Sequence, residues 1–245
     1  MKIHKELARL FGFELLHIRK DQPTVAAHLR QLFRLLDINC VIDVGANIGQ
    51  YGALLRKNGY RGRLISFEPV AATFAELAQN TKTDPAWRVY QCALGAKSAE
   101  REIQVTRSSV FSSFLEPNNY SKEQYPDSVP IVSLELVQIR TLDEMRSEIL
   151  SGLQNPRIFL KMDTQGYDLE VFAGAIGLLP RIEALQTEIS VQPIYAGMPR
   201  YLQSLARFQE AGYALTGLYP VSRDRSSLAL IELDCIMRKG PVTDQ

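Results

Sequence analysis

The first residues that could do chemistry surround a glycine turn. Asp43 belongs to the apolar run 40–44, and Gly45 and Gly49 follow it closely. Glycines let the backbone turn sharply and let a ligand approach where a Cβ would otherwise stand. In open α/β sheets, ligands bind outside the carboxyl ends of the strands. The order of strand, glycine turn and helix therefore predicts a ligand-binding turn at Gly45.

This turn differs from the one used by dinucleotide-binding proteins. A G-x-G-x-x-G pattern beginning at Gly45 would need glycine at positions 47 and 50, where this chain has Asn47 and Gln50. The carboxylate of Asp43 suits a ligand with a cationic amino group better than it suits a diphosphate. Together these features point to the methionine part of S-adenosylmethionine.

Glu68 is an acidic residue at the end of the next apolar run. It ends the run 63–68 and stands 25 residues after Asp43. An acidic side chain at this place can accept hydrogen bonds from both hydroxyls of a ribose. The alternative is a solvated carboxylate at a strand end. We prefer the ribose role because the turn and the acid occur together.

A second group of ionisable residues stands later in the chain. Lys161 and Asp163 are two residues apart in one apolar run, so they point to the same face of a strand. Either they form a structural ion pair, or Asp163 faces the cleft and orients the substrate or serves as a base. Glu188 ends the next run and is a second cleft carboxylate. We expect core or solvent positions for the histidines, which all precede the first strand: His4, His17 and His28.

The elements that must position these residues alternate along the chain. Helical patterns occupy 48–58 and 71–80, and they separate apolar runs that are typical of buried strands. The strands are expected at 40–44, 63–68, 87–92, 156–163, 184–191, 213–218 and 228–237. This alternation predicts an α/β fold, a parallel sheet with helices on both faces. Two amphipathic helices over 1–20 and 24–36 precede it, so we divide the chain into a helical extension, 1–38, and a main domain, 39–240.

The segment 106–130 breaks this rhythm. It is rich in Ser, Asn, Pro and Tyr and is long for a loop without secondary structure. We expect it to form part of the acceptor site. Four of its side chains can stack on a pyranose or hydrogen-bond to it: Asn118, Asn119, Tyr120 and Tyr125.

Composition excludes several classes of partner and site. The net charge of +1 gives no field that would recruit nucleic acid. No cysteine pair has the CxxC spacing of a zinc site, so we expect no metal, and we expect three buried thiols at Cys40, Cys92 and Cys235. No apolar stretch has the length of a membrane span, and charges interrupt any signal-peptide core, so the expected location is the cytoplasm. The first helix is basic and amphipathic and can contact a membrane surface, although such a stripe is more often core or lid.

The sequence resembles the FkbM family of S-adenosylmethionine-dependent methyltransferases, which are usually O-methyltransferases. The matching stretches are VIDVGANIGQY from Val41, ISFEPV from Ile65, CALG from Cys92, RTLDEM from Arg140, FLKMDTQGYDLEVFAGA from Phe159, QTEISVQPIYAG from Gln186 and ELDCIMRK from Glu232. They extend over residues 40–238. The first two occur in many class I methyltransferases, whereas the combination of the later stretches is far more specific.

The resemblance implies a class I methyltransferase fold, which is a Rossmann-like, doubly wound and mostly parallel sheet of seven strands. It also implies positions for the cofactor. The methionine pocket would consist of Asp43, Gly45, Ala46, Asn47 and Gly49. Glu68 and Pro69 would lie at the ribose, Ala93 and Leu94 would lie beside the adenine, and Asp163 would be nearest the transferred methyl.

The same resemblance implies a hydroxyl acceptor on a sugar of a surface glycan, a glycolipid or a polyketide, and of these we prefer a sugar of a glycan or glycolipid. S-adenosylmethionine carries its own leaving group, so the protein mainly positions the acceptor and takes its proton. Asp163 is the first candidate for that base, Glu188 the second and Lys161 the third. One departure stands out, because many relatives have an acidic residue where this chain has Gln165.

Two other classes of function compete with this interpretation. One is an NAD-dependent oxidoreductase on a similar fold, against which the missing glycine argues. The other is a protein without catalysis that keeps the fold as a partner of a glycan-assembly complex. The presence of Asp43, Gly45, Glu68 and Asp163 argues against such an inactive site.

Overall fold

The computed structural model describes residue 7, residue 11 and residues 24–240. The helix expected over 1–20 and its membrane contact therefore lie outside the described residues, apart from those two positions, as do His4 and His17. Within the described part of the chain, no helix is long and apolar enough to cross a membrane.

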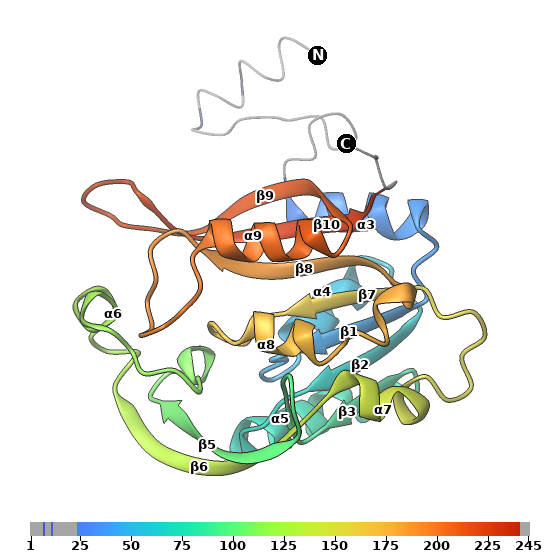
Figure 1. Cartoon of the computed structure of the whole chain (residues 1–245), viewed down its shortest axis with the longest axis horizontal. Helices are drawn as coiled ribbons and strands as arrows, with labels where there is room; N and C mark the ends of the chain where they lie inside the picture. The colour runs from blue at the N-terminus through green and yellow to red at the C-terminus, as the bar shows by residue number, and fades with distance from the viewer. Residues whose placement is uncertain (1–6, 8–10, 12–23, 241–245) are drawn as a thin grey trace.

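The main sheet has seven strands in the order β3-β2-β1-β7-β8-β10-β9 (Figure 1). The strands are β1 Cys40–Val44, β2 Arg63–Phe67, β3 Trp87–Tyr90, β7 Ile158–Met162, β8 Ile182–Ser190, β9 Tyr213–Arg223 and β10 Leu230–Lys239. Neighbours pair in parallel from β3 to β8, and β10 is antiparallel to both of its neighbours. The predicted mostly parallel sheet of seven strands is confirmed. Its order and its single reversed strand define the class I methyltransferase fold.

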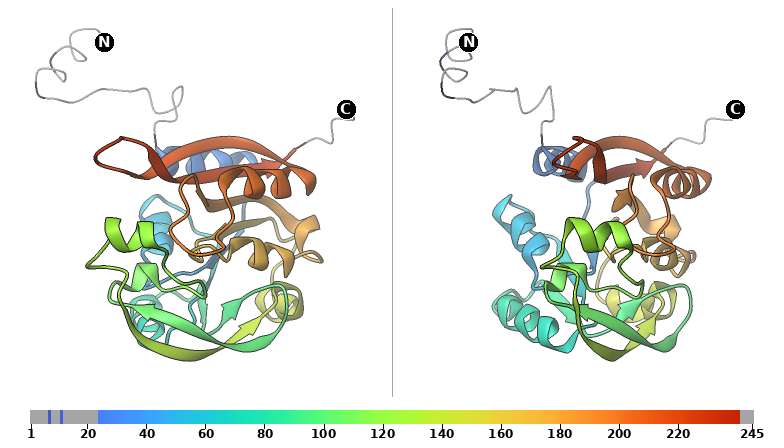
Figure 2. Two further views of the ribbon diagram at one scale, coloured as in Figure 1. Left: turned by 60° about the vertical axis from the view of Figure 1, so that its left-hand side comes forward. Right: turned by 90° about the vertical axis from the view of Figure 1, so that its left-hand side faces the viewer.

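Helices cover both faces of this sheet. In the right-hand view of Figure 2, α4 and α5 lie on one side of the strands, and α8 and α9 lie on the other. The first face carries α3 Val25–Leu35, α4 Gln50–Lys57 and α5 Ala71–Thr81, and the second carries α7 Leu142–Ile149, α8 Asp168–Ala173 and α9 Tyr201–Glu210. The predicted helix over 24–36 is α3, which begins at an N-cap where the Thr24 side chain accepts a hydrogen bond from the backbone N–H of Ala27. Because α3 packs Leu29 and Phe33 against the sheet, it is part of the same core as the strands.

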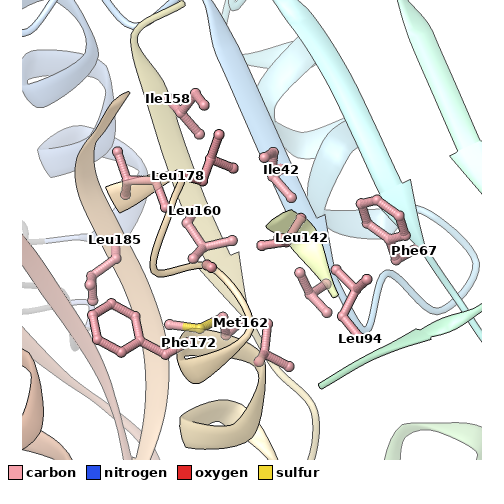
Figure 3. Close-up of a cluster of buried hydrophobic side chains, with 14 of the residues drawn as sticks. Ile42, Phe67, Leu94, Leu142, Ile158, Leu160, Met162, Phe172, Leu178 and Leu185 are labelled. Atoms are coloured by element: carbon pink, nitrogen blue, oxygen red, sulfur yellow. The ribbon is translucent and has the colours of Figure 1, made fainter. Parts of the chain in front are cut away.

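Successive side chains along each strand point to opposite faces of the sheet, so the strands contribute to two hydrophobic cores. Ile42 and Leu160 point to the α7–α8 side, where they pack with Leu142 and Phe172 (Figure 3). Val41 and other intervening residues point to the α3–α4 side instead. Every residue of β1 is buried, as expected for a strand of a parallel sheet that is covered on both faces.

A second, smaller sheet was not predicted from the sequence. It has the order β4-β6-β5 and is built from β4 Ala93–Leu94, β5 Ala99–Thr106 and β6 Ile131–Arg140. Only a minority of the residues in β5 and β6 are buried, so their sequences lack the continuous apolar run that marks the strands of the main sheet. These two strands flank the segment 106–130, which contains the one-turn helix η1 Ser109–Phe111 and the helix α6 Asn119–Gln124.

The backbone at the end of α8, at Gly174, lies directly against the backbone of the loop after β4, at Gly95. A Cβ placed on Gly174 would overlap the carbonyl oxygen of Gly95 and would also contact the Thr141 side chain. Gly174 also accepts a hydrogen bond from the backbone N–H of Asp143. The close approach of α8, α7 and the small sheet therefore requires glycine at this position.

We expect Gly174→Ala to lower the free energy of unfolding by about 1–3 kcal/mol, since overpacking forces the backbone segments apart. Urea denaturation measures this loss. The exposed residue Glu170 on the same helix supplies the control, and Glu170→Ala should change stability by less than about 0.5 kcal/mol. A Gly174→Ala protein as stable as the control would show that this backbone contact is not needed.

Candidate active site

A cavity of about 340 Å³ opens at the carboxyl ends of the parallel strands. On the side of β1 and β2 its lining includes Gly45, Asn47, Phe67, Glu68, Ala93 and Leu94. On the side of β7, β8 and β10 its lining includes Phe111, Tyr125, Asp163, Gln165, Glu188 and Glu232. One cavity therefore joins most of the predicted cofactor residues to two of the predicted catalytic residues, Asp163 and Glu188.

The glycine turn after β1 is fixed by close backbone contacts. Gly45 has a φ of +73°, and a Cβ on it would overlap the carbonyl oxygen of Asp163. The N–H groups of Gly45 and Ala46 both donate to the carbonyl oxygen of Phe67. A side chain at position 45 would thus be strained and would push apart the ends of β1 and β7, so this turn can form only with glycine.

Glu68 lies directly after β2 and is held by the same turn. Its Oε2 accepts a hydrogen bond from the Asn47 N–H at 2.9 Å, and its Oε1 accepts one from the Val70 N–H at 3.0 Å. Burial raises the pKa of Glu68 to about 7, although these two N–H groups act in the opposite direction. Each oxygen keeps a further lone pair, so the carboxyl group can still accept hydrogen bonds from a ligand in the cavity.

Asp43 occupies a different place from the one expected. Its side chain is fully buried, it does not line the cavity, and its Oδ1 lies 3.1 Å from Lys161 Nζ. The expectation that Asp43 itself forms the methionine pocket is corrected to a place beneath the pocket. The physical reason is its register with Lys161 on the neighbouring strand, which puts both side chains on the same inner face of the sheet.

Lys161 links this buried acid to the cavity. Its Nζ lies 3.3 Å from Asp163 Oδ2 and 3.4 Å from the carbonyl oxygen of Gly45. Burial by itself would lower the pKa of Lys161, but Asp43 and Asp163 outweigh this effect and raise it. The side chain is therefore a cation that holds its proton, and it does not line the cavity. The expectation that Lys161 could act as a base is therefore corrected, because a base must be free to accept a proton.

Asp163 combines the two roles between which the sequence left a choice. It is paired with Lys161, yet its side chain is 39% exposed and lines the cavity. The amide Nε2 of Gln165 donates to Asp163 Oδ1 at 3.2 Å and to Glu188 Oε2 at 3.3 Å. In turn, the Tyr195 hydroxyl donates to Gln165 Oε1 at 2.8 Å. Gln165 thus acts as a neutral bridge between two carboxyl groups.

Two further acidic groups close this side of the cavity. Burial raises the pKa of Glu188 well above its usual range, and the neighbouring acids Asp163 and Glu232 raise it further. Burial also raises the pKa of Glu232 to about 7. Glu232 was not among the predicted site residues, although the sequence held a signal for it. Two acids, Glu232 and Asp234, interrupt the apolar strand β10, and buried acids are costly without a partner or a role.

The segment 106–130 forms one wall of the cavity through η1, Phe114 and Tyr125. The Asn47 Nδ2 group donates to the Ser109 hydroxyl at 3.0 Å and so ties η1 to the glycine turn. Three expected sugar contacts are corrected, because Asn118, Asn119 and Tyr120 do not line the cavity. Asn118 caps α6 instead, and Tyr120 donates to Asp224.

The remaining predicted cofactor residues divide between lining and support. Pro69, Ala93 and Leu94 line the cavity. Ala46 and Gly49 do not: Ala46 is 1% exposed, and Gly49 is the N-cap of α4 with Leu77 and Trp87 next to its Cα. These two residues shape the turn from behind and are not in a position to touch a ligand.

The chain is similar to several known methyltransferases. The family described as "Methyltransferase FkbM domain" matches residues 43–215. The 2-O-methyltransferase NoeI of Sinorhizobium fredii is 25% identical over 190 residues, covering 74% of this chain and 75% of NoeI. Methyltransferase 1 of Beauveria bassiana is 25% identical over 148 residues, covering 56% of this chain and 59% of that protein.

Among solved structures, the crystal structure of Methyltransferase FkbM from Methylobacillus flagellatus aligns with a TM-score of 0.47 at 17% identity. The alignment covers 81% of this chain and 44% of that one, so the chain spans less than half the length of that protein. The family match extends from β1 into β9 and includes the glycine turn, Glu68, Asp163 and Glu188. This chain is a methyltransferase and belongs to the FkbM family.

Proposed function

We propose that the protein is an S-adenosylmethionine-dependent O-methyltransferase that methylates a hydroxyl group of a sugar. The observation that carries this proposal is a single cavity that is lined by the glycine turn, Glu68 and Asp163 together. The name of the relative NoeI, a 2-O-methyltransferase, supports oxygen as the methylated atom. Membership of a methyltransferase family favours methyl transfer over the hydride transfer that the sequence left open.

The residues present fit S-adenosylmethionine. Gly45 and Asn47 of the glycine turn line the cavity, so their backbone can face the methionine part of this cofactor. The Glu68 carboxyl group keeps free lone pairs for the two ribose hydroxyls. The apolar side chains of Phe67, Ala93 and Leu94 line the cavity and offer an apolar surface for adenine. The lining thus combines polar groups for the methionine part and the ribose with apolar groups for the adenine.

When bound, S-adenosylmethionine supplies a methyl group on a sulfonium leaving group. The chain must then orient the acceptor and accept its proton. Asp163 is placed for both tasks, because its two oxygens are fixed by Lys161 and Gln165 while the carboxylate remains exposed in the cavity. The Lys161 ammonium also keeps this carboxylate oriented. Glu188 is less suited to be the first base, since burial raises the pKa of its carboxyl group well above the usual range.

A sugar fits the acceptor side of the cavity. Phe111 and Tyr125 supply aromatic surface there, with their ring centroids 5.1 Å apart. The carboxyl groups of Asp163, Glu188 and Glu232 supply several hydrogen-bond acceptors. A pyranose combines an apolar face with a rim of hydroxyl donors, so both halves of such a ligand meet a matching surface.

We expect Glu68→Ala to weaken the binding of S-adenosylhomocysteine by about 1.5–3 kcal/mol at pH 8, the range for a hydrogen bond to a charged group. The wild-type affinity should rise from pH 6 to pH 8, because the pKa of Glu68 is about 7 and its ionised form is the better acceptor. The variant should lose this rise. Calorimetric titration at both pH values measures these effects.

Glu76 is exposed on α5, so Glu76→Ala is the control and should bind the ligand as wild type does. Thermal unfolding checks that both variants remain folded. Wild-type affinity in Glu68→Ala at pH 8 would contradict the ribose role. Wild-type protein that binds NAD and not S-adenosylhomocysteine would overturn the proposed function.

We expect Asp163→Asn to lower kcat by about 10²–10⁴-fold, the usual contribution of a general base. Cofactor affinity should stay nearly unchanged, since Asn keeps the size and one oxygen of the side chain. A screen of nucleotide sugars and glycan fragments with labelled cofactor identifies an acceptor and then gives kcat. Asp127 is an exposed residue of the segment 106–130, so Asp127→Asn is the control and should keep the wild-type kcat. Full kcat in Asp163→Asn would remove it from the catalytic role, and a loss confined to cofactor affinity would assign it to the methionine amino group.

A further inference from the structure

The acceptor side of the cavity has an excess of acidic groups. Asp163, Glu188 and Glu232 line it, and no Lys, Arg or His among the described residues lines any part of it. The cation that contacts Asp163 is Lys161, which lies beneath the cavity and is shared between Asp43 and Asp163. It therefore cannot serve as a partner for a negatively charged ligand.

Glu232 differs from the other two acids because one of its oxygens is buried and has no hydrogen-bond partner among the described residues. The side chain is only 6% exposed, and its Oε2 accepts a hydrogen bond from the Ser222 hydroxyl at 2.9 Å. Its Oε1 is buried and has no hydrogen-bond partner among the described residues. A buried acceptor without a donor is unfavourable, and this one belongs to a side chain that lines the cavity. A donor group of a ligand would satisfy it.

Asp163 and Glu188 each already accept a hydrogen bond from Gln165, which lies between them. Gln165 donates to both Asp163 and Glu188, and Tyr195 holds the Gln165 amide in that orientation. This bridge lets two carboxyl groups lie close together. Glu232 lies outside the bridge, opposite Ser190 on the neighbouring strand. Among the three acids, Glu232 is thus the one with a buried oxygen that still needs a hydrogen-bond donor.

The electrostatic state of the acids agrees with this arrangement. Burial raises the pKa of Glu232 to about 7 and raises the pKa of Glu188 as well, with Asp163 contributing to both. A further negative charge in the cavity would face the same desolvation and the same repulsion. A hydroxyl group meets neither penalty, because it brings a donor and no charge.

We infer that Glu232, together with Glu188 and Asp163, selects acceptors that are uncharged and carry hydroxyl groups around the methylated position, and that it excludes acceptors with a carboxylate, phosphate or sulfate there. This inference rests on the proposed function, because it names the class of acceptor for the same site. Glu232 is the specificity-determining residue, and its free oxygen accepts a hydroxyl next to the one that is methylated.

Matched pairs of sugars test the inference. The probes are the methyl α-pyranosides of glucose, galactose and mannose, each compared with the corresponding uronate, which differs only by a carboxylate at C6. Ligand-observed NMR titration gives Kd with and without S-adenosylhomocysteine. We expect at least one neutral sugar to bind about tenfold more tightly than its uronate, or better, since like charges placed close together at a binding site are strongly disfavoured. Equal binding, preference for the uronate, or no binding by any probe would overturn the inference.

Three variants, one of them a control, test whether Glu232 sets this selectivity. Glu232→Gln keeps the size of the side chain and should reduce the ratio of the two Kd values by about threefold or more. Glu123→Gln removes the same charge from an exposed position on α6 and should leave the ratio unchanged. Val221→Lys adds a cation at the half-exposed rim of the cavity and should strengthen uronate binding. An unchanged ratio in both Glu232→Gln and Val221→Lys would show that charge in this cavity does not set specificity.

The design separates this inference from the proposed function. Binding of S-adenosylhomocysteine is measured first and decides the cofactor alone. The sugar comparison on the ligand-free protein decides the charge selectivity, whatever the cofactor result. Loss of one conclusion therefore leaves the other open to its own measurement.

Discussion

The ammonium group of Lys161 is the interaction on which the rest of the site depends. It lies between the buried carboxylate of Asp43 and the exposed carboxylate of Asp163, and it also reaches the carbonyl oxygen of Gly45. It thereby joins β1, the glycine turn and the end of β7 at one point. A fully buried carboxylate is unfavourable without such a partner. The position of Asp163 in the cavity thus follows from the need to compensate charge inside the sheet.

Lys161 is one member of a polar row that crosses the sheet. Ser66, Asp43, Lys161 and Gln186 occupy matching register positions on four neighbouring strands. The row two residues earlier is apolar, with Leu64, Val41, Phe159 and Ala184, and it packs against α3 and α4. Residues beyond the polar row line the cavity. Tyr51 of α4 covers the polar row, because its hydroxyl donates to Gln186 and its ring lies beside Lys161. The same strands therefore contribute hydrophobic core residues near their amino ends and site residues at their carboxyl ends.

The cavity acquires its second wall from chain that is not part of the main sheet. The small sheet brings η1 over the carboxyl ends of the strands, and the hydrogen bond from Asn47 to Ser109 joins this wall to the glycine turn. On the opposite side, Gln165 stands between Asp163 and Glu188. With an acid in place of Gln165, three carboxyl groups would share this space. The neutral amide of Gln165 instead holds Asp163 and Glu188 in place without adding a charge.

The sequence by itself determined the strands of the main sheet, the glycine turn, Glu68 and Asp163, because each follows from a pattern within a few residues. An apolar run ending in glycine or an acid indicates both a buried strand and its functional end. The tertiary structure alone decided that Asp43 lies beneath the cavity, that Lys161 is a paired cation and that Glu232 joins the site. It also decided the small sheet and the capping role of Asn118. The physical reason is that these features depend on which strands pair and in what register. The reversed strand β10 meets β8 across a long stretch of chain, and no local pattern records that pairing.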